Sequence, residues 1–226
     1  MTNDVRIEGV IFDMDGVLCD SEEFICKAAI EMFRRHYGVT PHPDDFLPFV
    51  GAGENRYIGG VAEKHGVSVK LPEDKVRTYE IYLEIIKGCL GPLPGVLDFT
   101  AACRRQGIKL AVASAADRMK VEGNLAEIGI PADHFDAVVT GSDVNRYKPD
   151  PECFLMAAEK IGIDPAKCLV VEDAINGCRA AKSANSWCLG LTTSFSGKQL
   201  AESGADWTTC HLAEVPCELK QQLGIA

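Results

Sequence analysis

The feature that most constrains the fold is the alternation of short apolar runs with helical segments in the second half of the chain. Four runs read as buried strands, at residues 108–113, 135–140, 167–171 and 187–191. Residues 5–12 have the same apolar, β-branched character and end in a turn-like acidic segment. Because parallel neighbours in a sheet need helical crossovers between them, we expect an α/β fold with a Rossmann-like, doubly wound parallel sheet.

The segment between the first strand and the remaining strands has a different pattern. Residues 20–90 contain no convincing strand and several stretches with helical periodicity. The run Gly91-Pro92-Leu93-Pro94-Gly95 then marks a break, after which the strands begin. We therefore predict a catalytic core formed by residues 1–19 and 91–226, and an all-helical cap inserted at residues 20–90.

Composition and charge argue against several classes of partner. The 226 residues carry 23 Lys and Arg against 33 Asp and Glu, which gives a formal net charge of −10. Such a chain has no electrostatic attraction for nucleic acid or for an anionic membrane surface, and its apolar runs fall far short of the roughly 20 residues that a bilayer span needs. We expect no nucleic-acid partner, no membrane partner and a monomer. The N-terminal residues do not resemble a secretion signal, so we expect a cytoplasmic protein with reduced cysteines.

Polar side chains follow the strands at the sheet edge where doubly wound folds bind their ligands. They are a carboxylate pair with a glycine, a hydroxyl, a lysine and a second carboxylate pair: Asp13, Asp15, Gly16, Ser114, Lys148, Glu172 and Asp173. One carboxylate of the first pair can act as nucleophile and the other as general acid, and Mg²⁺ prefers carboxylate oxygens. Each group alone also occurs as an ordinary turn, cap or surface residue. Their joint occurrence indicates phosphoryl transfer through an aspartyl ester.

On these motifs the sequence resembles the haloacid dehalogenase superfamily, in the branch of β-phosphoglucomutases and phosphoglycolate phosphatases. The four family motifs are matched by Asp13-Met14-Asp15-Gly16-Val17, Ser114, Lys148-Pro149 and Glu172-Asp173-Ala174. The helical insert resembles the C1 cap of that branch. A weaker resemblance, carried by the cap loop and residues 110–121, is to the dehalogenase-type domain of plant suppressor-of-quenching proteins.

The resemblance implies a role for each motif residue. Asp13 is expected to attack phosphorus, and Asp15 is expected to protonate the leaving oxygen and later to activate water. Mg²⁺ is expected on Asp13, the Asp15 carbonyl, Glu172 and Asp173, because a carboxylate attacking a phosphate needs local neutralisation. The expected substrate-binding residues are Gly16, Ser114, Ala115 and Lys148 in the core, and Glu54, Asn55 and Arg56 in the cap loop.

Three functions stay open at this point, and a phosphohydrolase for a small phosphorylated metabolite is preferred. Asp15 argues against the dehalogenase and phosphonatase branches, whose members typically carry another residue there. A phosphosugar mutase of the β-phosphoglucomutase type is the first alternative, but residues 21–25 lack the histidine usual in those mutases. In those mutases an arginine of the cap loop binds a second phosphate. This chain has Glu54 near the corresponding position, which would repel that phosphate, although Arg56 lies close by. The second alternative is a regulatory module that senses a phosphorylated metabolite without turning it over.

Overall fold

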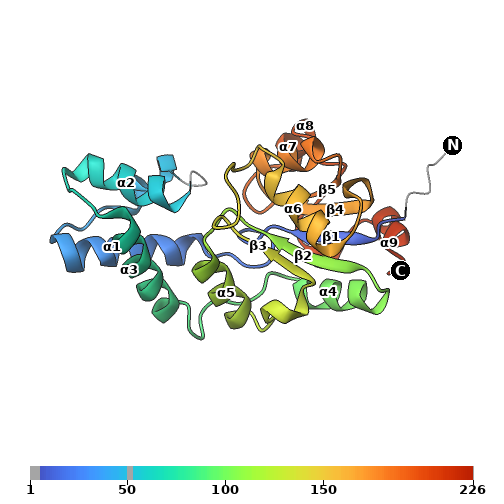
Figure 1. Cartoon of the computed structure of the whole chain (residues 1–226), viewed down its shortest axis with the longest axis horizontal. Helices are drawn as coiled ribbons and strands as arrows, with labels where there is room; N and C mark the ends of the chain where they lie inside the picture. Colours follow the sequence, from blue (N-terminus) through green and yellow to red (C-terminus); the bar gives the residue numbers. More distant parts are fainter. Residues whose placement is uncertain (1–5, 50–52, 226) are drawn as a thin grey trace.

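The computed structural model describes residues 6–49 and 53–225, and a parallel sheet lies at its centre (Figure 1). Six strands pair in the order β3-β2-β1-β4-β5-β6. Their bounds are β1 Gly9–Phe12, β2 Lys109–Ala113, β3 Ala137–Val139, β4 Cys168–Glu172, β5 Trp187–Leu191 and β6 Trp207–Thr209. The predicted doubly wound α/β fold is confirmed. The edge strand β6 was not predicted, because three residues with an exposed Thr208 give neither an apolar run nor an alternating pattern.

Helices cover both faces of the sheet because successive strand residues point to opposite sides. Ile11 of β1 belongs to a core cluster with α6 (Glu152–Ile161), α7 (Ile175–Ser183) and α8 (Gly197–Glu202). Its neighbours Val10 and Phe12 belong to the cluster with α4 (Val96–Arg105), α5 (Arg118–Glu127) and α9 (Cys217–Leu223). Figure 1 shows the first group above the sheet and α4 and α5 below it. Because both faces of the sheet are buried, the central strands are continuous apolar runs in the sequence.

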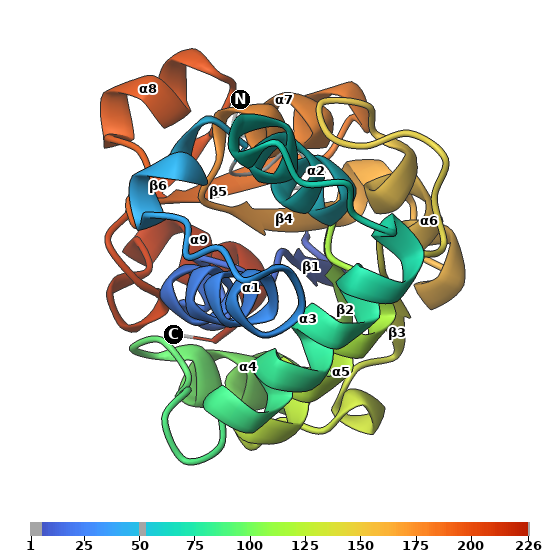
Figure 2. The ribbon, with the colours of Figure 1, turned by 90° about the vertical axis from the view of Figure 1, so that its left-hand side faces the viewer.

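Three further helices form a lobe beyond the carboxyl ends of the strands (Figures 1 and 2). They are α1 (Glu22–Tyr37), α2 (Glu54–His65) and α3 (Leu71–Ile85). The buried residues of α1 recur at helical spacing, and α1 packs along α3. Cys19 bridges to Pro92, so the two chain crossings between the lobes lie side by side. We propose that this lobe is the cap, and its boundaries at residues 20 and 90 stay a prediction.

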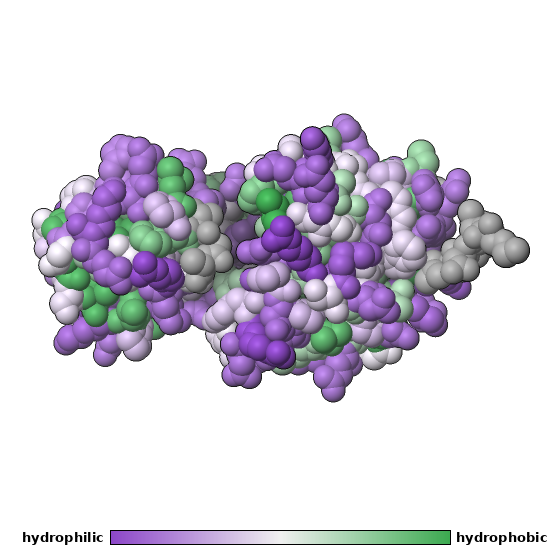
Figure 3. Space-filling model, turned by 90° about the horizontal axis from the view of Figure 1, so that it is seen from above, coloured by the Kyte–Doolittle hydropathy of each residue, from purple (hydrophilic) through white to green (hydrophobic). Residues whose placement is uncertain are grey.

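The surface seen from above is mostly hydrophilic over both lobes (Figure 3). Apolar residues on this face form only small patches, and the molecule narrows between the cap helices and the core. Within residues 6–49 and 53–225, no helix combines the length and the apolar character needed to cross a bilayer.

Candidate active site

A cavity of about 720 Å³ lies between the carboxyl ends of the strands and the cap helices. All the residues predicted for the core part of the site line it: Asp13, Asp15, Gly16, Ser114, Ala115, Lys148, Glu172 and Asp173. They meet there because β3, β2, β1 and β4 are neighbouring parallel strands, whose carboxyl ends share one edge, and each motif lies at or after the end of one of them. The fold thus brings the four sequence motifs to one place.

The Lys148 ammonium group joins two of the carboxylates. Its Nζ atom lies 2.5 Å from Asp13 Oδ1 and 2.6 Å from Glu172 Oε1, and it donates to the Ala113 carbonyl at 3.2 Å. Burial disfavours the charged form, but the two neighbouring carboxylates outweigh burial and hold the pKa of Lys148 well above its usual value. Lys148 therefore stays charged inside the site.

One lysine does not balance the carboxylates that surround it. Asp13, Glu172 and Asp173 each offer an oxygen within 4.8 Å of the others. Burial, with repulsion from Glu172 added, raises the pKa of Asp173 to about 7. Burial also raises the pKa of Asp13 above its usual value, against the attraction of Lys148. Clustered oxygen donors with uncompensated negative charge suit a hard divalent cation, so these three residues fit Mg²⁺.

Two backbone N–H groups and the absence of a side chain on Gly177 hold the Glu172 carboxylate in this cluster. Its Oε2 accepts hydrogen bonds from the backbone N–H groups of Asp173 and Ala174, each at 2.9 Å. A Cβ atom on Gly177, in the first turn of α7, would lie only 1.9 Å from Glu172 Cδ. The glycine therefore leaves the space that the Glu172 carboxylate occupies.

Asp173 is positioned in a similar way from another side. Its Oδ2 accepts hydrogen bonds from the hydroxyls of Thr193, at 3.3 Å, and Ser194. Gly16 has a φ of +75°, and a Cβ atom there would lie 2.0 Å from Asp173 Oδ2. Thr193 and Ser194 were not among the predicted residues, because they match none of the four motifs. Their place directly after the predicted strand at residues 187–191 is the signal that could have found them.

Replacing Gly177 tests whether the position of Glu172 matters. Gly177→Ala is expected to weaken Mg²⁺ binding about 10- to 100-fold, because the new Cβ displaces a carboxylate of the cluster. Titration calorimetry with Mg²⁺ measures the effect. Gly59→Ala in α2 is the matched control, since the nearest atom that a Cβ would meet there is 3.8 Å away. The control should keep its metal affinity and gain thermal stability, and unaltered affinity in Gly177→Ala would contradict the assignment.

The Asp15 side chain is held apart from this cluster by two other groups. The Ser21 hydroxyl donates to its Oδ1, and the Lys120 ammonium lies 2.8 Å from its Oδ2. Lys120 comes from α5, and its side chain is only 4% exposed. Burial opposes its charge, but the neighbouring carboxylates of Asp15 and Glu54 outweigh burial and raise its pKa above the usual value. A neutral hydroxyl and a charged ammonium group thus fix the orientation of Asp15.

Lys120 is another site residue that was not predicted from the sequence. The buried residues of α5 are Lys120, Val121, Asn124 and Leu125, a stripe at helical spacing. A lysine at an apolar helical position is rarely buried unless it is paired with a charge. That mismatch between residue type and position is the signal that could have found it.

The cap contributes differently from what was predicted. Glu54 lines the cavity, but Asn55 and Arg56 are exposed and do not line it. Arg56 instead pairs with Glu63 at 3.0 Å and lies over the ring of Phe49, 4.8 Å from its centroid. The preceding loop residues 50–52 lie outside the described part of the chain. In this arrangement substrate contacts from Asn55 and Arg56 have no structural support.

Comparisons with known proteins identify relatives of this chain. Residues 7–185 match the family model of the haloacid dehalogenase-like hydrolases. The chain is 40% identical over 203 residues to Protein Suppressor of Quenching 1, chloroplastic, of Arabidopsis thaliana, which covers 88% of this chain but only 19% of that protein. It is 33% identical over 213 residues to a phosphorylated carbohydrates phosphatase of Thermotoga maritima, covering 88% and 92% of the two chains. The crystal structure of CbbY from Rhodobacter sphaeroides in complex with phosphate superposes with a TM-score of 0.81 at 27% identity, covering 92% and 96%.

Proposed function

The chain belongs to the haloacid dehalogenase-like hydrolases, and from that premise we propose that it is a Mg²⁺-dependent phosphatase acting through a phosphoaspartate on Asp13. The observation that carries the proposal is the meeting of Asp13, Lys148 and Asp15 at one cavity. We place the substrate among small phosphorylated carbohydrates, because the Thermotoga maritima relative is a phosphatase of such compounds. The cytoplasmic location and the monomeric state stay predictions.

The first chemical step transfers the phosphoryl group to Asp13. An Asp13 carboxylate oxygen forms a bond to phosphorus while the bond from phosphorus to the ester oxygen breaks. Asp15 gives its proton to that oxygen, which leaves as an alcohol. In the second step water attacks phosphorus, Asp15 takes a proton from the water, and the bond to Asp13 breaks. Phosphate is released and both carboxyl groups return to their starting states.

The other groups of the core stabilise the charge on the transferring phosphoryl group. Lys148 contacts Asp13 directly, so its ammonium group lies where phosphoryl oxygens would collect. The Ser114 hydroxyl accepts from the Ala116 N–H at 3.1 Å, which leaves its own proton free for a phosphoryl oxygen. Mg²⁺ held by Asp13, Glu172 and Asp173 would supply the remaining neutralisation of those oxygens.

The cap half of the cavity favours a phosphatase over a mutase. A mutase has to grip a second phosphate, which requires free cationic groups opposite the core. Arg56 pairs with Glu63 outside the cavity, and Lys120 is already paired with Asp15. Glu54 adds negative charge to the same region. The mutase and the metabolite sensor are therefore alternative outcomes of the phosphate-release assay described below.

Removing the Lys120 charge tests how Asp15 is held. Lys120→Met is expected to lower kcat about 100-fold, because a misplaced general acid costs rates of this order. Lys87→Met, an exposed lysine at the end of the cap, is the matched control and should keep full activity. Steady-state kinetics with p-nitrophenyl phosphate separate kcat from KM. A change confined to KM would show that Lys120 binds substrate and does not position Asp15.

The experiment that tests the function is a phosphate-release assay with Mg²⁺ across sugar phosphates, phosphoglycolate, nucleotides and p-nitrophenyl phosphate. β-Glucose 1-phosphate is run in parallel with and without its bisphosphate. Selective phosphate release is the expected result. Isomerisation to glucose 6-phosphate exceeding phosphate release would identify a mutase, and binding without turnover would identify a sensor.

A further inference from the structure

We propose that the cap half of the cavity is a subsite for a hydroxyl- or ammonium-bearing part of the substrate and that it rejects a second anionic group. The subsite is formed by Glu22, Glu54, Tyr57 and Lys120, and we call it the cap subsite. This inference rests on the proposed phosphatase function, because it names the class of ester that the same cavity accepts.

Two carboxylates of the cap subsite have no ion-pair partner among the described residues. Glu22, at the start of α1, and Glu54, at the start of α2, both line the cavity. Burial raises the pKa of each above its usual value. The nearby Lys120 lowers the pKa of both, but its ammonium group is already paired with Asp15. Such carboxylates accept hydrogen bonds from hydroxyl or ammonium groups, and they repel anions.

Tyr57 supplies an independent sign of a missing ligand. The residue lines the cavity and is only 6% exposed. Its hydroxyl is buried and makes no hydrogen bond with the described residues, although Glu22 and Cys26 lie next to it. Buried hydroxyls are normally paired, so a polar group of a substrate in the cap subsite would provide the partner that the protein does not.

The cations at the cavity are already engaged. The described residues that line it include seven carboxylates, Asp13, Asp15, Asp20, Glu22, Glu54, Glu172 and Asp173, but only two lysines. Lys148 pairs with Asp13 and Glu172 in the core, and Lys120 pairs with Asp15. A divalent cation at the core cluster would still leave the cap subsite negative. A second phosphate or a carboxylate on the substrate would therefore meet repulsion there.

The test compares three linear phosphates that share one reacting end. Sorbitol 6-phosphate, 1-amino-1-deoxysorbitol 6-phosphate and 6-phosphogluconate differ only in carrying a hydroxyl, an ammonium or a carboxylate group at the far carbon. Each is measured as a competitive inhibitor of p-nitrophenyl phosphate hydrolysis, so the comparison does not require that the three compounds are themselves hydrolysed. We expect 6-phosphogluconate to inhibit at least about tenfold more weakly than the other two, since each tenfold step needs only about 1.4 kcal/mol.

Variants assign the discrimination to the cap subsite. In the double variant Glu22→Gln and Glu54→Gln the three inhibition constants should converge. Glu23→Gln is the matched control, because that side chain on α1 is 75% exposed and pairs with Lys27; it should keep the wild-type pattern. Equal or tighter binding of 6-phosphogluconate to the wild type overturns the subsite. Failure of the wild type to hydrolyse p-nitrophenyl phosphate overturns the proposed function instead, so the two failures are distinguishable.

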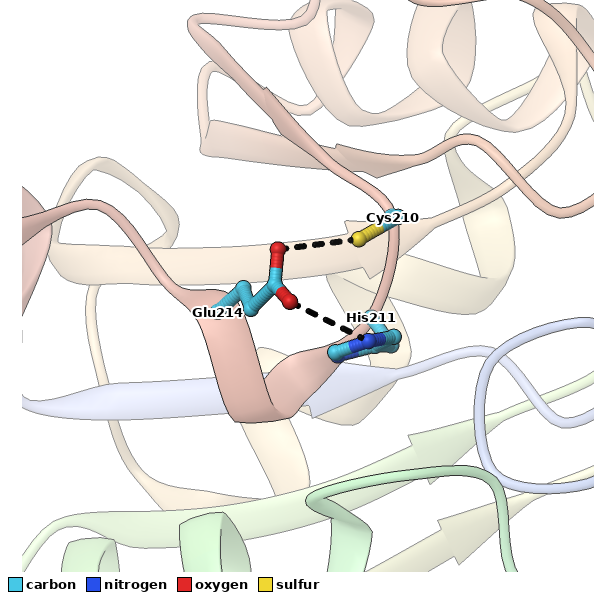
Figure 4. A group of neighbouring side chains, drawn as sticks. All are labelled: Cys210, His211 and Glu214. Atoms are coloured by element: carbon cyan, nitrogen blue, oxygen red, sulfur yellow. Dashed lines mark hydrogen bonds and ion pairs between the residues drawn. The ribbon is translucent and has the colours of Figure 1, made fainter.

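A second inference rests on a different group of side chains, none of which lines the cavity. Cys210, His211 and Glu214 lie where β6 leads into the short 3-10 helix Leu212–Glu214, and Figure 4 shows the Glu214 carboxylate facing the other two side chains. Cys210 Sγ is 3.2 Å from Glu214 Oε2, and His211 Nε2 is 3.6 Å from Glu214 Oε1. One ligand atom from each residue lies within 4.8 Å of the others.

The geometry points to a binding site for Zn²⁺ at these three residues. A thiolate, an imidazole and a carboxylate are the donors that Zn²⁺ uses, and three protein ligands leave a fourth position for water. The turn is fixed by two hydrogen bonds, from Thr209 Oγ1 to the Glu214 carbonyl at 2.9 Å and from the Glu214 N–H to the His211 carbonyl at 3.1 Å. Metal binding would replace the proton of the Cys210 thiol, which is released to solvent.

Titration of the protein with Co²⁺ tests this site, because a thiolate on Co²⁺ gives a near-ultraviolet charge-transfer band. We expect one equivalent of Co²⁺ to produce the band, Zn²⁺ to abolish it, and Cys210→Ser to lack it. The variants Cys89→Ser and Cys217→Ser are controls, since these are the other exposed cysteines, and both should keep the band. The all-oxygen cluster at Asp13 cannot produce this signal. A band that is absent in the wild type, or that survives in Cys210→Ser, overturns the proposal.

Discussion

Asp13→Asn is expected to reduce phosphate release at least about 10⁴-fold, the scale of loss seen when a nucleophile is removed from an enzyme. The amide has nearly the same shape as the carboxylate but does not attack phosphorus. Asp13 is buried, and burial together with Glu172 and Asp173 disfavours its charge. The substitution should therefore leave the melting temperature unchanged or raised. Release of phosphate from p-nitrophenyl phosphate and thermal unfolding measure the two parts of this expectation.

Asp98→Asn is the control for Asp13→Asn, because Asp98 is an exposed carboxylate on α4 away from the cavity. It should retain wild-type turnover. Substantial activity in Asp13→Asn, with a background excluded by repeated purification, would contradict the assignment of Asp13 as nucleophile. A loss of activity accompanied by unfolding would contradict the expected stability.

Lys148→Met is expected to lower activity about 10²- to 10³-fold, as removal of one group that stabilises transition-state charge does in other enzymes. It should also lower the free energy of unfolding without metal by about 3–5 kcal/mol, because breaking a buried pair leaves its charges uncompensated. Metal affinity should change in the opposite direction. With the ammonium gone, Asp13 and Glu172 lose the neutralisation that they receive at 2.5 and 2.6 Å, so Mg²⁺ should bind more tightly.

Thermal unfolding with and without Mg²⁺ checks the Lys148 prediction. Added Mg²⁺ should stabilise Lys148→Met more than the wild type, because a ligand that binds the folded state more tightly raises its stability more. Lys160→Met, an exposed lysine on α6, is the matched control and should behave as the wild type. Weaker Mg²⁺ binding in Lys148→Met would mean that Lys148 does not compete with the metal for the carboxylates.

The core of the site was predictable because two simple rules act together. Buried parallel strands read as apolar runs, and polar residues directly after them meet at one sheet edge. Asp13, Ser114 and Asp173 could therefore be placed together without a structure. The helical character of the cap segment followed equally from periodicity. The edge strand β6 was not predicted from the sequence, because it is short and partly exposed.

The cap half of the cavity was not predictable in the same way. Which residues of α1 and α2 face the core depends on how the cap helices pack, and helical periodicity gives only the face of each helix. Arg56 was expected at the substrate but lies over Phe49, whereas Glu22 and Tyr57 line the cavity without any motif. Lys120 lies on α5, 105 residues after Asp15 in the sequence, yet its ammonium group contacts the Asp15 carboxylate. Such long-range pairings follow from tertiary packing.

The central claim, that Asp13 carries the phosphoryl group, is tested most directly by trapping the phosphoenzyme. Asp15→Asn is mixed with Mg²⁺ and p-nitrophenyl phosphate, quenched in acid within the first turnover, digested, and mapped by mass spectrometry. We expect one phosphoryl group on the peptide that contains Asp13, because Asp15→Asn cannot activate the water that releases it. The adduct should be absent in Asp13→Asn. Phosphate release without any covalent adduct, or an adduct on another residue, would contradict the mechanism.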